Sequence, residues 1–118
     1  MIGKTLLSLM FMASGIVCSF GADMSGTWTV ASSLGSSPTC TFTQTENFIS
    51  GPCKGANADG TAFGVVDGQS VRWAWQWVAT AGHNLGAFDF SGDVDRDSNI
   101  SGVIMVGNQT GSFTAKKQ

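Results

Sequence analysis

Tryptophan is the residue whose type and spacing stand out most in this chain. Trp73, Trp75 and Trp77 occupy every second position of one segment, so in a β-strand all three project from the same face. Each indole can bury roughly 150–250 Å², which is worth about 4–6 kcal/mol at 25 cal/mol per Å². We therefore expect the three rings to face the protein interior, either as packed core or as the wall of a ligand cavity. An exposed row that stacks on sugar rings is a third interpretation.

The indole N–H groups favour a ligand cavity over a packed core, because buried donors need hydrogen-bond acceptors and a ligand could supply them. Few inward polar side chains are expected to supply them, chiefly Gln44 and Gln69. We predict a ligand site with the tryptophans as stacking surface, further aromatic residues as walls, and a glutamine as polar handle. Its residues are Trp73, Trp75, Trp77, Phe42, Phe90 and Gln44, with Phe63 and Phe88 as additional walls.

An acidic segment invites comparison with a calcium loop, because Asp93, Asp95 and Asp97 alternate as in the first half of such a loop. The glycine of that loop is replaced by Ser98, and Ile104 stands where a bidentate glutamate belongs. We expect a polar turn between two strands and no metal site.

Catalytic chemistry has little support in the sequence. His83 is the only histidine, and it lies in a predicted loop without an acidic residue nearby. The chain contains no nucleophile motif, metal-ligand cluster or phosphate-binding loop. The sequence predicts a protein that is not an enzyme and that carries no cofactor.

The first 21 residues have the pattern of a signal peptide. Lys4 is their only charge, an apolar run extends over 6–17, and small residues, among them Ser19, surround a cleavage point after Gly21. The apolar run is shorter than the roughly 20 residues of a membrane span. A buried N-terminal helix and lipid attachment at Cys18 are the alternatives. We expect export to a periplasmic or extracellular location and one domain over residues 22–118.

The net charge of the expected mature chain limits the classes of molecule that it could bind. Five lysines and arginines stand against eight aspartates and glutamates, which gives a net charge of −3. Without a basic patch, binding to nucleic acid or to anionic lipid is disfavoured. Removal of the leader leaves Cys40 and Cys53, an even pair that predicts a disulfide in an exported domain.

Short β-rich runs, separated by turn residues about every ten positions, predict an all-β fold. We expect an antiparallel up-and-down meander barrel of about eight short strands, with a sandwich as alternative. The expected strands are 26–31, 39–45, 48–53, 61–65, 69–80, 85–91, 100–106 and 112–116.

Two hairpins can be worked out from the sequence. A two-residue turn at Glu46-Asn47 sets Cys40 opposite Cys53, although Pro52 then requires an edge or a bulge. In the second hairpin, we choose a three-residue loop at 66–68 with a left-handed Gly68. That loop places Phe63 on the same face as Val71 and Trp73.

Several segments together resemble the avidin-like and lipocalin-like (calycin) barrels. The resemblance rests on Gly26-Thr27-Trp28, on 42–51, on 60–77, on Phe90-Ser91-Gly92 and on 113–116. It implies a ligand-binding barrel in which Trp77 and Phe90 match aromatic walls and Trp73 matches a packing tryptophan. The chain has no tyrosine, is shorter by about a hairpin between Ile100 and Phe113, and has a disulfide without a fixed counterpart. The resemblance therefore implies a ligand other than biotin.

These observations predict reversible binding of a small apolar or aromatic molecule inside the barrel. The alternative is a structural or protein-interaction module of the cell envelope or the secreted proteins, with a solid core and no small-molecule ligand.

Overall fold

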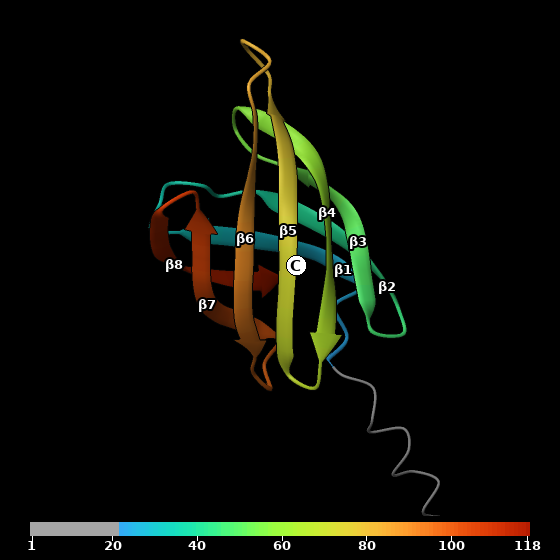
Figure 1. The fold of residues 1–118 in the computed structure, drawn as a ribbon. Coiled ribbons are helices and arrows are strands. Elements are labelled where there is room, and N and C mark those ends of the chain that lie inside the picture. Colours follow the sequence, from blue (N-terminus) through green and yellow to red (C-terminus); the bar gives the residue numbers. More distant parts are fainter. Residues whose placement is uncertain (1–21) are drawn as a thin grey trace, which may run out of the picture.

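The computed structural model describes residues 22–118, so the predicted signal peptide and Cys18 lie outside the described residues. The fold consists of eight strands in chain order (Figure 1). In this part of the chain no helix is long and apolar enough to cross a membrane. The strands are β1 (Gly26–Ser32), β2 (Thr39–Thr45), β3 (Phe48–Lys54), β4 (Ala58–Asp67), β5 (Ser70–Ala79), β6 (Leu85–Val94), β7 (Asn99–Val106) and β8 (Gln109–Lys117).

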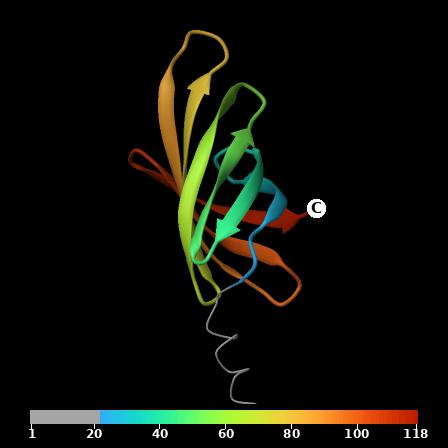
Figure 2. The ribbon, with the colours of Figure 1, turned by 90° about the vertical axis from the view of Figure 1, so that its right-hand side faces the viewer.

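The strands form a closed barrel in which each strand pairs with the next in antiparallel fashion. The first and last strands close it, with Trp28 paired to Lys117 and Ser32 paired to Phe113. The predicted all-β meander barrel is confirmed, and all eight expected strands are present with ends shifted by at most three residues. The hairpins β3–β4 and β5–β6 project at one end of the barrel, and the β4–β5 turn lies at the other (Figure 2).

Alternating side chains explain why these runs form strands with one buried face. In β2, Cys40 and Phe42 are buried and Gln44 is half-buried, whereas the intervening threonines are exposed. The same alternation in β5 buries Val71, Trp73 and Trp75. The prediction that the tryptophan row points inward is therefore confirmed.

The β2–β3 hairpin has the register predicted from its sequence. Cys40 pairs with Cys53 and forms the disulfide, and Gln44 pairs with Ile49. The turn residue Glu46 has a positive φ of 56°, as the first loop position of a primed hairpin turn requires. Pairing between the two strands is interrupted opposite Gly51 and Pro52, where the proline has no N–H to donate.

The predicted three-residue loop at 66–68 is wrong, and Phe63 pairs with Ala74 and not with Val71. Asp67 pairs with Ser70, so the loop is the two-residue Gly68-Gln69, with Gly68 at φ 64°. This register turns Phe63 outward, where it is 46% exposed, instead of bringing it beside Trp73. Space explains the register, because the position opposite Trp73 is Gly64, and a Cβ there would lie 2.7 Å from the Trp73 Cβ.

Replacing Cys40 and Cys53 together by alanine should lower the free energy of unfolding by about 3 kcal/mol. The bond links residues 13 positions apart and restricts the unfolded chain. Urea denaturation under oxidising and reducing conditions measures the loss. Reduction should destabilise the wild type and leave the double variant unchanged; an equally stable double variant would contradict the prediction.

Candidate functional site

The inward face of β5 organises the interior. Each tryptophan has one partner on β4 and one on β6. Trp73 lies between Gly64 and Phe90, and Trp75 lies between Ala62 and Phe88. Trp77 lies between Gly60 and Gly86. The β4 partners are all glycine or alanine. On β6 the partner is glycine beside Trp77 and phenylalanine beside Trp75 and Trp73.

Glycine at position 86 decides where the Trp77 ring lies. A Cβ on Gly86 would lie 2.2 Å from Trp77 Cζ2 and 2.7 Å from Cε2. The indole therefore rests against the β6 backbone, on the barrel wall, and does not extend across the lumen. A side chain at position 86 would have to push this ring inward.

The middle of the barrel is filled by an aromatic cluster. Trp73 stacks on Phe90 with ring centroids 4.8 Å apart and an interplanar angle of 14°. Phe42 and Phe113 meet Trp73 edge-on at 5.4 and 5.5 Å. All four side chains are at most 3% exposed, so this cluster is packed core.

The end of the barrel near the β4–β5 turn is closed by the chain segment that precedes β1. Met24 is fully buried, and its carbonyl accepts a 2.9 Å hydrogen bond from Trp28 Nε1. The Ala22 N–H donates to the Gly68 carbonyl at 2.9 Å. Gln44 belongs to the same closure, because its Oε1 accepts from the Met24 N–H and its Nε2 donates to the Glu46 carbonyl.

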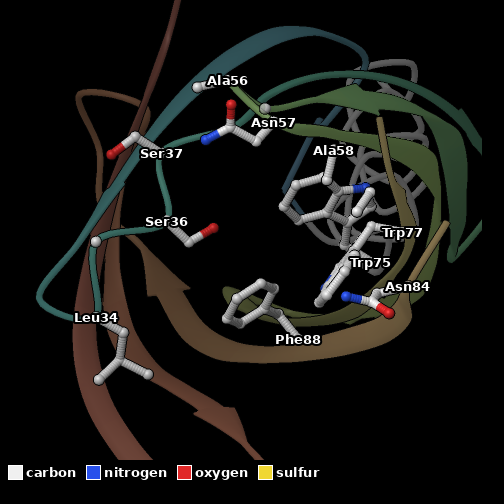
Figure 3. Close-up of a pocket in the computed structure, with 13 residues that line it drawn as sticks. Leu34, Ser36, Ser37, Ala56, Asn57, Ala58, Trp75, Trp77, Asn84 and Phe88 are labelled. Atoms are coloured by element: carbon white, nitrogen blue, oxygen red, sulfur yellow. The ribbon is translucent and has the colours of Figure 1, made fainter. Parts of the chain in front are cut away.

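The opposite end is open and holds a cavity of about 450 Å³ (Figure 3). Trp75, Trp77 and Phe88 form its aromatic side, and three loops complete it. The lining consists of Leu34, Gly35, Ser36, Ser37, Gly55, Ala56, Asn57, Ala58, Trp75, Trp77, Ala79, Asn84 and Phe88.

Hydrogen bonds and the disulfide hold the lining loops in place. Loop 33–38 is joined to β8, because Ser33 Oγ accepts from the Ser112 N–H at 2.9 Å. Loop 55–57 is closed by the Gly55 N–H, which donates to the Ala58 carbonyl at 2.7 Å. Cys40 follows the first loop and Cys53 precedes the second, so the disulfide joins the strands that carry them.

The structure brings only some of the predicted ligand residues to the cavity. Trp75, Trp77 and Phe88 line it. Trp73, Phe42 and Phe90 lie in the packed core, and Gln44 lies at the closed end. Phe63, predicted as a further wall, is on the outer surface.

Sequence reasoning missed the loop residues of the mouth, chiefly Ser36, Asn57 and Asn84. A usable signal was present in the small residues Gly55, Ala56 and Ala58, which do not fill a barrel end. These residues lie in the loop between β3 and β4 or at the start of β4.

As the sequence suggested, the indole N–H groups of the tryptophan row have too few hydrogen-bond acceptors. The Nε1 atoms of Trp73, Trp75 and Trp77 are buried without a hydrogen-bond partner among the described residues. Trp28 differs, since Met24 satisfies it. The three unpaired donors are covered by protein atoms, so they do not open onto the cavity.

The acidic segment after β6 is an ordinary capped turn. Asp95 Oδ1 accepts from the Asp97 N–H at 2.8 Å and from the Asn99 N–H at 3.0 Å. Asp93 accepts from the Ser70 hydroxyl. Within residues 22–118, no group of three acidic, histidine or cysteine side chains is placed to hold a metal ion. His83 is exposed near the tip of the β5–β6 hairpin.

Alanine substitution should separate core from cavity along β5. Trp73→Ala should lower the free energy of unfolding by about 3–5 kcal/mol, as for other large buried aromatic residues. Trp77→Ala should cost less than half as much, because its ring is half-buried beside existing empty space. Chemical denaturation of both variants measures the difference; equal losses would show that Trp77 is packed as tightly as Trp73.

Comparison with models of protein families, with curated proteins and with solved structures finds no match to this chain. The function of the site must therefore be inferred from its shape and lining. It is a neutral cavity at one end of a barrel, with aromatic rings on one side and small polar side chains around the mouth.

Proposed function

We propose that this protein binds a small apolar or aromatic molecule at the open end of its barrel. The observation that carries the proposal is the position of the Trp77 ring, which lies against Gly86 at the barrel wall beside the cavity. Eight-stranded barrels either fill with side chains or hold one small ligand. This barrel is filled around Trp73 and open beyond Trp75.

The size and lining of the cavity support the same proposal. Its volume of about 450 Å³ falls in the range of small-molecule sites, roughly 300–1,000 Å³. Its aromatic side consists of the half-buried rings of Trp77 and Phe88, with the buried Trp75 (2% exposed) behind them. The site that we propose therefore consists of Trp75, Trp77 and Phe88, with Trp73, Phe42 and Phe90 as the core that supports them.

We propose binding without catalysis. Among the lining residues, Ser36 and Ser37 carry hydroxyl groups, and no histidine, lysine or carboxylate of the lining is there to activate them. Export is part of the proposal, and the Cys40–Cys53 disulfide is typical of proteins in oxidising compartments. The avidin-like or calycin-like relationship also remains a proposal, supported by the barrel topology and the inward tryptophan row.

A second function is favoured by the outer surface. Phe63, Val103 and Met105 are 46%, 42% and 47% exposed on the outside of β4 and β7. Together with Val65 they border a depression of about 450 Å³ that also contains Arg72 and Asp89. Exposed apolar groups of this kind are found at protein contacts. In that case the protein acts as an interaction module.

Gly86→Val should abolish binding of a small aromatic probe. The new side chain displaces the Trp77 ring into the cavity, at a stability cost of about 1–3 kcal/mol for overpacking. Naphthalene serves as the probe, and the indole ¹H–¹⁵N resonances of Trp75 and Trp77 report its binding. Ala87→Val is the matched control, because residue 87 is the exposed neighbour of Gly86 and should leave binding unchanged.

Trp75→Ala gives an independent check on the same proposal. Naphthalene should shift the intrinsic tryptophan fluorescence of the wild type and have no effect on this variant. If no aromatic compound changes the emission of the wild type and Trp75→Ala only lowers stability, the row is core and the interaction module is the better interpretation.

A further inference from the structure

The cavity lining carries no charged side chain. Its thirteen residues are glycine, alanine, leucine, serine, asparagine, tryptophan and phenylalanine. An ion taken from water into such a site loses hydration without gaining a countercharge. The group that enters the cavity is therefore neutral.

The aromatic side of the cavity is shaped for a flat molecule. Trp75 and Phe88 are nearly parallel, with ring centroids 5.8 Å apart and an interplanar angle of 20°. Trp77 is tilted by 32° to Phe88, with centroids 6.1 Å apart. Trp77 and Phe88 are the half-buried rings of this side, and accessible aromatic rings favour offset stacking with another aromatic ring.

Polar recognition is confined to the mouth. The buried indole N–H groups are closed to a ligand, whereas Ser36, Asn57 and Asn84 stand around the opening (Figure 3). The backbone carbonyl of Asn57 accepts from the Thr80 N–H at 2.9 Å, and that of Asn84 accepts from the Ala79 N–H at 2.8 Å. These bonds fix the backbone of both asparagines beside the cavity.

A side-chain amide offers a donor and an acceptor next to each other. A ligand edge that carries an adjacent N–H and C=O is complementary to this pair. Figure 3 shows the Asn84 amide beside the aromatic rings, with the Ser36 hydroxyl directed into the space between the loops. The polar edge of a stacked ligand would meet these groups.

We infer that the occupant is a neutral, planar heteroaromatic molecule of one or two fused rings with an amide-like polar edge. Its apolar ring stacks on Trp77 and Phe88, which Trp75 supports from behind, and its polar edge faces Asn84 at the mouth. This inference rests on the proposed function and specifies the ligand class for the same cavity.

The test compares three probes of similar shape on the purified protein. 2-Quinolone has the neutral lactam edge, naphthalene lacks any polar edge, and 2-naphthoate carries a negative charge. Titration calorimetry gives the affinities, and the indole resonances of Trp75 and Trp77 locate the binding. Asn84→Ala should weaken 2-quinolone about fivefold to tenfold, as expected for hydrogen bonds to one amide, and should weaken naphthalene, which has no polar edge, by less. 2-Naphthoate should bind more weakly than 2-quinolone.

Asn108→Ala is the matched control, since Asn108 lies in the β7–β8 turn and does not line the cavity. It should change no affinity. If all three probes bind equally and Asn84→Ala has no effect, the inferred ligand class is wrong while the aromatic site stands. If no probe shifts the Trp75 and Trp77 resonances, the proposed function fails, and the inferred class fails with it.

Discussion

Three indoles on one face of one strand impose the constraint on which the rest of this barrel depends. Each ring is wider than the spacing between neighbouring strands, so the positions beside it must be small or must stack on it. Strand β4 meets this constraint with Gly60, Ala62 and Gly64. Strand β6 has a small residue, Gly86, beside Trp77, and it has the stacking residues Phe88 and Phe90 beside Trp75 and Trp73.

The change in bulk along β6 explains why the interior is solid in one half and open in the other. Phe90 stacks on Trp73 and fills the lumen, whereas Gly86 lets Trp77 lie on the wall. Phe88, between them, belongs to both regions, because it touches the core through Phe90 and lines the cavity. The residues that stabilise the fold and those that form the site are thus neighbours on the same two strands.

The strands, their order of pairing and the disulfide register were predictable, because each depends on short-range alternation and turn chemistry. Cys40 and Cys53 fall opposite each other once the turn is placed at Glu46-Asn47. The orientation of Phe63 was predicted wrongly, because hydrophobicity alone favours an inward position for a phenylalanine. The decisive fact is the space beside Trp73, which only a glycine at position 64 leaves free. The alternation Gly60, Ala62, Gly64 in the sequence marks the inward face of β4 and could have corrected the register.

The cavity itself was harder to predict from sequence. Trp73, Trp75 and Trp77 are chemically equivalent in the sequence, and their different surroundings arise from strands and loops that the fold brings together. Asn57 and Asn84 are 27 residues apart in the chain and line the same cavity only because β4, β5 and β6 are adjacent. Nothing in the local composition of either loop indicates that they share a rim.

The closure of one barrel end by Met24 determines where a molecule could enter or leave the barrel. Because the fully buried Met24 side chain closes one end, the interior of the barrel opens to solvent at the other end only. Any guest must leave by the route it entered, past loops 33–38 and 55–57. If the proposed ligand binds, these loops would set its residence time, and substitutions at the closed end would change stability without changing its exchange.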